Sequence, residues 1–594
     1  MSDRVPPLYP WSLNRLLLRV AAEWSDRKEI FGLAGRRFFR PDAAVDLGCD
    51  IAGHRVGTPV GPAAGPHTQM AQNIALSWLA GARTFELKTV QILDELDIER
   101  PCIDMENIGY NIEWSQELTL DESLAEYAKS ALLLAVLRRW EPLTDFLGDM
   151  SGPDADYAFE LSVGYDLAGI QSDRMTAFVS GMRDAGERID RFRRDIPAPF
   201  GSLRDVPVAS RIVDHATLST FHGCPPHEIE DIIKHLMTVH GMDVTVKLNP
   251  TLLGMDTVRE ILHDRLGYTE VPLVPEAFAA DLKFDRALEM ITRLEKFAAS
   301  HGRRFGIKLT NTLVVGNERG VMPGKQMYLS GKPLHVMAVT LLDRLIEALP
   351  RMFGLGGGEG PVPVAFSAGI DKDNLTDAVA LGLTPVTICS DLLKPGGYGR
   401  MAQGLRKLSR TMKENGLTNL DELRSKADTE ARKAGHRDSV QALALHLATP
   451  KGAAPYALAA TGKPLRSVDN QLEMFDCVAC TNCVTVCPND AFFHVPSKDT
   501  AGLEARSQYL VLAELCNDCG NCTTFCPEMG APHLIKPRLF TSNDAWVTAG
   551  RQGFLLGISG DGLVKAEGPV ADEIAMVNNL VENESWLKSC LEGE

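Results

Sequence analysis

The chain has 594 residues, of which 45% are hydrophobic, 23% charged and 7% aromatic, so we expect a folded protein of two to four domains. Its formal net charge of −17, with no basic stripe to offset it, argues against a nucleic-acid partner. No segment is long and apolar enough for a membrane span or resembles a signal peptide, so we expect a cytoplasmic protein whose 13 cysteines are ligands, catalysts or buried thiols.

Residues 1–45 are expected to form a helical arm, and eight short segments rich in Val, Ile, Thr and Leu then alternate with helical periodicity. These segments are Thr58–Gly65, Thr84–Val90, Ala158–Gly164, Ala216–Phe221, Val244–Pro250, Phe305–Thr312, Val362–Gly369 and Pro385–Asp391. Eight strand and helix units predict an α/β fold, a TIM (β/α)8 barrel over residues 46–410. Residues 120–210 are longer than a barrel connection needs and strongly helical, so we expect a helical insertion there.

The carboxyl ends of the predicted strands carry the residues suited to chemistry, as in other barrels of this kind. Small residues follow the last two strands, in Ser367–Gly369 and Cys389–Ser390, and they favour a phosphate site built from backbone amides. A phosphorylated flavin fits such a site. Lys88 and Lys247 lie within apolar strands, where an ammonium needs an acceptor-rich partner. Flavin oxygens are one such partner, and structural ion pairs at the barrel rim are the alternative.

Residues 411–465 form a predicted helical linker to two matching cysteine runs, which end at Pro488 and Pro527. Each run has the spacing C-x2-C-x2-C-x3-C-P, which is typical of two 4Fe-4S clusters in which the fourth cysteine of each run ligates the other cluster. We expect one cluster on Cys477, Cys480, Cys483 and Cys526, and a second on Cys516, Cys519, Cys522 and Cys487. A zinc ribbon is the alternative, but a zinc ribbon does not require two runs that each contain four cysteines followed by a proline. The module is expected to span residues 466–540, and residues 541–594 form an extension of unassigned role.

Residues 46–410 resemble the FMN-binding barrel of dihydroorotate and dihydropyrimidine dehydrogenases. The resemblance lies in Pro59–Pro66, Leu87–Thr89, Asn111–Glu113, Val246–Pro250, Thr310–Thr312, Ser367–Asp371 and Ile388–Ser390. The cysteine module resembles bacterial two-cluster ferredoxins, and its place after the barrel is that of the dihydropyrimidine dehydrogenases. The segment Phe221–Glu228 is similar to a branch described as selenate reductase subunits, although neither cysteine run supplies a molybdenum or selenium site.

This resemblance implies roles for individual residues. Ala63, Ala64 and Lys88 would lie along the flavin, Lys247 would contact its ring and ribityl oxygens, and its phosphate would be held by Ser330, Gly331, Ala368, Gly369, Cys389 and Ser390. Asn111, Asn311 and Thr312 would bind a pyrimidine-like substrate. Thr217 stands where that family has a fourth asparagine, and Cys224 follows it by only seven residues, in a loop that is shorter than the family's.

Reduction of a C=C bond by a flavin needs a hydride and a proton, so the site needs an acid. We predict that Cys224 is this acid, because a thiol with an ordinary pKa near about 8.5 is protonated at neutral pH. The alternative is a buried structural thiol. No dinucleotide-binding fingerprint is found, so electrons would come through an FAD- or NAD(P)H-binding partner subunit or a ferredoxin, and we expect an oligomer or a complex.

Two other functions stay open at this stage. The chain could be an electron-transfer subunit whose FMN relays electrons within a larger complex and has no organic substrate of its own. It could also be a barrel that has lost its flavin and serves as a scaffold for the ferredoxin module, although the two strand-end lysines argue against that.

Overall fold

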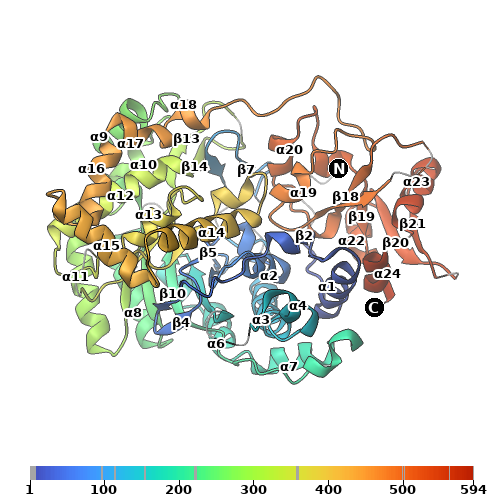
Figure 1. Cartoon of the computed structure of the whole chain (residues 1–594), viewed down its shortest axis with the longest axis horizontal. Helices are drawn as coiled ribbons and strands as arrows, with labels where there is room; N and C mark the ends of the chain where they lie inside the picture. The colour runs from blue at the N-terminus through green and yellow to red at the C-terminus, as the bar shows by residue number, and fades with distance from the viewer. Residues whose placement is uncertain are drawn as a thin grey trace.

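The computed structural model describes residues 8–94, 98–112, 115–150, 152, 155–219, 224–320, 322–355, 360–497, 500, 502–560, 562–582 and 584–592. A barrel surrounded by helices forms one part of the molecule, and a smaller module near the C-terminus packs beside it (Figure 1). None of the helices in the described ranges has the length and apolar character needed to cross a membrane.

The barrel consists of eight parallel strands in the order β5-β16-β15-β12-β11-β10-β9-β6. They are β5 (Val60–Pro62), β6 (Thr84–Glu86), β9 (Ala158–Val163), β10 (Val213–Ser219), β11 (Asp243–Leu248), β12 (Phe305–Leu309), β15 (Val364–Phe366) and β16 (Val386–Ile388). Each of the eight predicted segments overlaps one of these strands, although β10 and β11 begin earlier than predicted, and this confirms the predicted barrel. The first and second strands meet where the Arg83 amide donates to the Val60 carbonyl at 3.0 Å. A Cβ at Gly61 would lie 1.7 Å from the Thr84 carbonyl oxygen, so this close approach requires glycine.

Amphipathic helices cover the barrel because its strands are buried on both faces. The principal ones are α2 (Ala71–Leu79), α3 (Leu120–Leu137), α8 (Pro226–Thr238), α11 (Phe284–Ser300), α12 (Lys332–Ala348), α13 (Leu375–Ala380) and α14 (Gly399–Glu414). Within residues 120–210, α3 packs against α6 (Asp173–Arg183) and α7 (Gly186–Arg194), and strand β9 of the barrel lies between them in the chain. In the segment expected to be a linker, α15 (Leu420–Lys433) and α16 (Ser439–Ala448) pack against α13 and α12 of the barrel.

A four-stranded antiparallel sheet forms a roof at the carboxyl end of the barrel. Its order is β13-β14-β8-β7, with β7 (Ile103–Asp104), β8 (Gly109–Asn111), β13 (Leu313–Gly316) and β14 (Gln326–Ser330). Two segments far apart in the sequence supply its strands, and Tyr328 pairs with Asn111 in the register between them. The connections after the second and sixth barrel strands therefore close over the end of the barrel together.

The C-terminal module contains a five-stranded sheet in the order β17-β18-β19-β20-β21. Its strands are β17 (Phe492–Pro496), β18 (Ser507–Leu512), β19 (Arg538–Phe540), β20 (Phe554–Ile558) and β21 (Val564–Glu567). The last two lie beyond residue 540, so the C-terminal extension continues the sheet of the cysteine module. It ends in α23 (Ala571–Val581) and α24 (Ser585–Glu592).

The N-terminal helix α1 (Leu13–Arg27) packs against the C-terminal helix α24, and the two helices lie side by side (Figure 1). Arg19 of α1 is buried between them. Its guanidinium donates to Asp490 at 2.7 Å and lies 4.7 Å from the ring centroid of Trp586. The arm thus connects the beginning of the chain to the cysteine module.

Candidate functional site

A cavity of about 480 Å³ lies at the carboxyl ends of the strands, under the antiparallel roof. This volume is in the range of small-molecule and cofactor sites. Among the residues expected to bind a flavin, the cavity is lined by Ala63, Ala64, Lys88, Lys247, Ser330, Gly331, Gly369, Cys389 and Ser390. Among those expected to bind a substrate, it is lined by Asn111, Asn311 and Thr312. The structure therefore brings most of the predicted residues into one site.

One end of the cavity is built from small residues and hydroxyl groups. The Ser330 and Ser390 hydroxyls are 2.9 Å apart. Gly331 immediately precedes helix α12, and Gly369 has a φ of +57° with its backbone so close that a Cβ would lie 2.4 Å from the Gly331 carbonyl oxygen. Exposed amides and hydroxyls beside the start of a helix suit a phosphate group.

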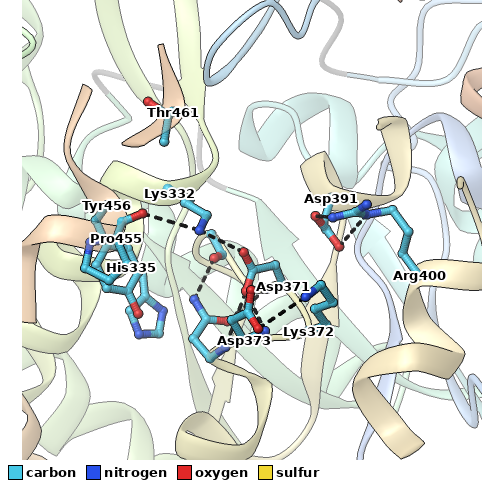
Figure 2. A network of polar contacts seen from close by, with 12 residues as sticks. Lys332, His335, Asp371, Lys372, Asp373, Asp391, Arg400, Pro455, Tyr456 and Thr461 are labelled. Carbon is cyan, nitrogen blue, oxygen red and sulfur yellow. Dashed lines mark hydrogen bonds and ion pairs between the residues drawn. The ribbon is translucent and has the colours of Figure 1, made fainter. Parts of the chain in front are cut away.

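A network of ion pairs fixes the turns behind this end of the cavity (Figure 2). The Lys332 ammonium is 3.0 Å from Asp371 and also donates to the Pro455 carbonyl at 3.3 Å. Arg400 donates to both carboxylate oxygens of Asp391, at 2.7 and 2.9 Å. The first pair links the turns after β14 and β15, and the second ties the turn after β16 to α14. Together they hold the small-residue end in place.

Ala368 does not line the cavity, unlike the other residues expected at the phosphate. It is fully buried, and its carbonyl oxygen lies 3.2 Å from Nδ1 of His335 on α12. The imidazole of His335 in turn stacks on Tyr456, with 5.1 Å between the ring centroids. Ala368 therefore supports the turn from behind, whereas Gly369 borders the cavity.

Two buried hydroxyl groups in the cavity wall have no hydrogen-bond partner among the residues that the structure describes. They are the Oγ1 atoms of Thr310, after β12, and Thr387, in β16. Buried polar atoms are nearly always satisfied, so these two indicate a polar ligand. Together with the hydroxyl and glycine end and the buried Lys88 and Lys247, they fit a phosphorylated flavin.

Lys247 forms an ion pair with a carboxylate that the sequence analysis did not select. Its ammonium is 2.7 Å from Oε1 of Glu86, while Oε2 of Glu86 accepts from Lys308 at 2.8 Å and from the Ala64 amide at 2.9 Å. Burial alone would raise the pKa of Glu86, but the two ammonium groups lower it to about 2. The structural ion pair considered as an alternative thus exists for Lys247, which nevertheless borders the cavity. The sequence did offer a sign of Lys308, because a lysine within the apolar segment Phe305–Leu309 needs a buried partner.

The roof adds two aromatic residues that the sequence analysis missed, Tyr110 on β8 and Tyr328 on β14. Nothing in the local sequence marks them, because the roof joins two distant segments. Asn311 donates to Asn249 at 2.8 Å, and Asn249 donates to Asp281 at 3.1 Å. These contacts fix the amide of Asn311 at the cavity wall.

Thr217 is fully buried and does not line the cavity. Its hydroxyl donates to the carboxylate of Glu160 on the neighbouring strand β9. It therefore belongs to the barrel interior in this structure.

Cys224 lies beside a second, much smaller cavity, together with Asn249 and Asp281. Only 4% of the residue is exposed. Burial, and then the carboxylates of Glu228 and Asp166, raise the pKa of Cys224 to about 12, so its thiol is protonated at neutral pH. Asn249 is hydrogen-bonded to Asn311 and stands between the two cavities. Residues 220–223 of the same loop lie outside the described residues.

The structure gathers the first predicted set of cysteines around one space and places members of the second set close to one another. Cys477, Cys480, Cys483 and Cys526 surround one small space with Tyr509 and Lys536. In the second group, burial and then its neighbours Cys516 and Cys487 raise the pKa of Cys522. Within the described ranges, no three His, Cys, Asp or Glu side chains are grouped to hold a single metal ion. Four thiols around one space are the ligand set that an iron-sulfur cluster requires.

The second cysteine group is docked against the wall of the large cavity. The Cys519 carbonyl accepts from the amides of Cys102, at 3.1 Å, and Ile103, at 3.0 Å. Asn521 donates to the Leu393 carbonyl at 2.9 Å. Because Ile103 and Leu393 both line the cavity, a single layer of residues separates it from this cysteine group.

A barrel of this kind joined to a cysteine module defines an iron-sulfur oxidoreductase, and the comparisons with known proteins agree. Residues 476–531 match the model of the 4Fe-4S dicluster domain. Residues 31–438 match the model described as "Oxidoreductase YgfK, N-terminal TIM-barrel domain", so the chain belongs to the YgfK oxidoreductase family.

The curated relatives include the Escherichia coli strain K12 protein named "Putative oxidoreductase YgfK" and its counterpart in strain O157:H7. Each is 39% identical over 418 residues, which are 67% of this chain and 39% of the relative. The match thus spans about two fifths of the length of these relatives. Among solved structures, the ligand-free dihydroorotate dehydrogenase (DHODH) of Eimeria tenella is similar with 15% identity and a TM-score of 0.41, over 68% of this chain and 97% of that one.

Proposed function

We propose that this chain is a flavoprotein in which FMN occupies the large cavity and exchanges electrons with two 4Fe-4S clusters on the docked module. The contact between the Ile103 amide and the Cys519 carbonyl carries this proposal. Ile103 lines the cavity, and Cys519 belongs to the second cysteine group. Donor and acceptor would therefore face each other across one layer of residues.

The order of the clusters follows from their burial. Cys516, Cys519 and Cys522 are buried beside the barrel, whereas Cys477, Cys480, Cys483 and Cys526 are partly exposed. The second group would hold the inner cluster, next to the flavin, and the first group the outer one. A partner subunit that binds FAD or NAD(P)H, or a ferredoxin, would exchange electrons with the outer cluster.

Bound FMN supplies hydride transfer and both one- and two-electron chemistry. The Ser330 and Ser390 hydroxyls and the backbone at Gly331 and Gly369 would bind its phosphate. Lys247, held by Glu86, would face an acceptor-rich part of the flavin. The Thr310 and Thr387 hydroxyls would find partners on the ligand.

The substrate class follows from the amide groups at the cavity wall. Asn111 and Asn311 offer paired donors and acceptors, and Thr312 adds a hydroxyl. Such a set suits a small cyclic amide, for example a pyrimidine, whose C=C bond would accept a hydride. Cys224 would donate the proton, since its raised pKa keeps the thiol protonated. For this step the Cys224 thiol would have to reach past Asn249 into the large cavity.

A second candidate is an electron-transfer subunit without an organic substrate of its own. The observation that favours it is the place of Cys224 beside a separate cavity. The hydrogen bond from the Thr217 hydroxyl to Glu160 also favours an electron-transfer subunit, because it keeps Thr217 away from the cavity.

The test is anaerobic. The purified protein is assayed for FMN and for about eight irons per chain, as two cubanes require, then reduced and mixed with uracil, thymine or orotate while flavin reoxidation is followed. Cys49→Ala is the matched control for Cys224→Ala, because burial also raises the pKa of Cys49 to about 12.

Fast reoxidation by one compound, lost in Cys224→Ala and kept in Cys49→Ala, supports reduction of a C=C bond. A flavin that the clusters reduce and none of the compounds reoxidises supports the electron-transfer subunit. Protein that contains iron but no FMN contradicts both.

A further inference from the structure

A chain of buried charged groups crosses the barrel interior next to the large cavity. It begins at Lys247, which lines the cavity, and continues through Glu86 to Lys308. The Lys308 ammonium is also 3.7 Å from Glu160, which in turn lies 3.6 Å from Nδ1 of His215. The side chains of Glu86 and Lys308 are completely buried.

This arrangement is unusual for the interior of such a barrel, where layers of bulky branched apolar side chains are the rule. Removing charges from water is unfavourable unless they are closely paired, and apolar residues of similar size often serve stability equally well. A role in the chemistry of the site would account for these charges.

The chain of charges reaches the cavity through Glu86. One of its oxygens holds the Lys247 ammonium at 2.7 Å, and the other accepts from the amide of Ala64 at 2.9 Å. Lys247 and Ala64 both border the cavity. The small-residue end suited to a phosphate is built from the turns after β14, β15 and β16. Lys247 on β11 borders the same cavity and would face an acceptor-rich part of a bound flavin.

The charge balance of this group is fixed by its ion pairs. Although burial would raise the pKa of Glu86, Lys247 and Lys308 lower it, so the carboxylate is ionised. Burial lowers the pKa of His215, and the nearby Glu160 carboxylate only partly offsets that effect. The imidazole is therefore neutral at any pH above the ordinary pKa of histidine. Two carboxylates then balance two ammonium groups.

We propose that Glu86 and Lys308 are positioning residues that set the reduction potential of the flavin from behind the cavity wall, with Lys247 as the group that faces it. The inference rests on the proposed function, because it requires FMN in the cavity. Two electrons and one proton convert the neutral oxidised flavin ring to its reduced anion, so the ring gains one negative charge. Loss of the Glu86 charge therefore favours the reduced flavin, and loss of the Lys308 charge disfavours it.

The test compares Glu86→Gln with Lys308→Met by equilibrating the flavin with a redox dye at pH 8, where His215 is neutral. Glu86→Gln should increase the equilibrium constant for flavin reduction at least tenfold, and Lys308→Met should decrease it at least tenfold. Each tenfold change equals about 30 mV for a two-electron couple. Glu584→Gln removes the buried carboxylate that pairs with the partly exposed Arg27, far from the barrel interior, and should leave the constant unchanged.

Shifts of opposite sign support the inference, because structural damage to neighbouring buried residues would move both variants in the same direction and weaken FMN binding in both. Equal shifts, or none, in variants that retain FMN overturn the inference and leave the proposed function intact. A wild-type protein without FMN overturns both.

Discussion

Asn482 and Asn521 occupy equivalent places in the two cysteine runs but differ in one contact with the barrel. Each begins a short helix, α19 (Asn482–Val486) or α20 (Asn521–Phe525). Asn482 donates to the Phe525 carbonyl at 3.0 Å, and Asn521 donates to the Val486 carbonyl at 2.8 Å. Among the described residues, Asn521 alone of the two has a second bond, to the Leu393 carbonyl in the cavity wall.

Alanine at either position removes one hydrogen bond within the module. The difference between the two variants therefore reports the one additional bond that Asn521 makes to the barrel. Asn521→Ala also deprives the buried Leu393 carbonyl of its donor, which costs about 1–3 kcal/mol. Since 1.4 kcal/mol corresponds to a factor of ten, the docked surface should open about 5 to 140 times more often in this variant. Asn482→Ala should leave that opening unchanged.

Amide hydrogen exchange measures this opening directly, because the amides of Cys102 and Ile103 donate to Cys519 across the interface. Mass spectrometry of a peptide covering residues 98–112 should show faster exchange in Asn521→Ala than in Asn482→Ala or the unaltered protein. Equal exchange in the two variants would refute the reasoning, since the interface bond would then contribute nothing to docking. The same comparison of flavin reduction rates would show whether docking limits electron exchange.

Three further outcomes are expected from the site. Thr387→Val should weaken FMN binding about five- to tenfold in a titration, because a hydrogen bond contributes about 1 kcal/mol, and should not lower the free energy of unfolding of the flavin-free protein. Gly369→Ala should reduce the flavin content of the purified protein, because its Cβ would lie 2.4 Å from the Gly331 carbonyl at a φ of +57°; unchanged content would contradict the proposed phosphate site. Because burial raises the pKa of Cys224 to about 12, its thiolate fraction is still small at pH 8 and should grow about tenfold per pH unit toward pH 10. The alkylation rate of Cys224, read by mass spectrometry, should follow that rise, and a plateau near pH 8.5 would contradict it.

The barrel and the cysteine groups could be predicted because both depend on residue periodicity and spacing within short stretches of the sequence. Alternating apolar segments and helical periodicity located all eight strands, and the rule that barrel chemistry lies at the carboxyl ends of strands selected residues such as Lys247 and Ser390. The cysteine spacing assigned each thiol to its group for a similar reason. In these cases neighbours in the sequence, or the repeat of a simple unit, fix the position in space.

Other features depend on contacts between distant segments, and the tertiary structure alone decided them. The roof that brings Tyr110 and Tyr328 over the cavity pairs strands more than two hundred residues apart in the printed sequence. Ala368 lies behind the cavity wall, where its carbonyl oxygen contacts Nδ1 of His335. Cys224 lies beside a smaller cavity, on the far side of Asn249 from the large one. The sequence marks these residues by type, but not the direction in which each points.

The sequence by itself determined the class of fold, the cysteine groups and most of the cavity wall, since these follow from periodicity and spacing. Closure of the barrel decided the rest. It brings Glu86 of β6 against Lys247 of β11 and Lys308 of β12, which are distant in the chain and meet only across the barrel interior. Buried charges must be paired wherever the fold places them, so the partner of each lysine is a property of the closed barrel and not of any one segment.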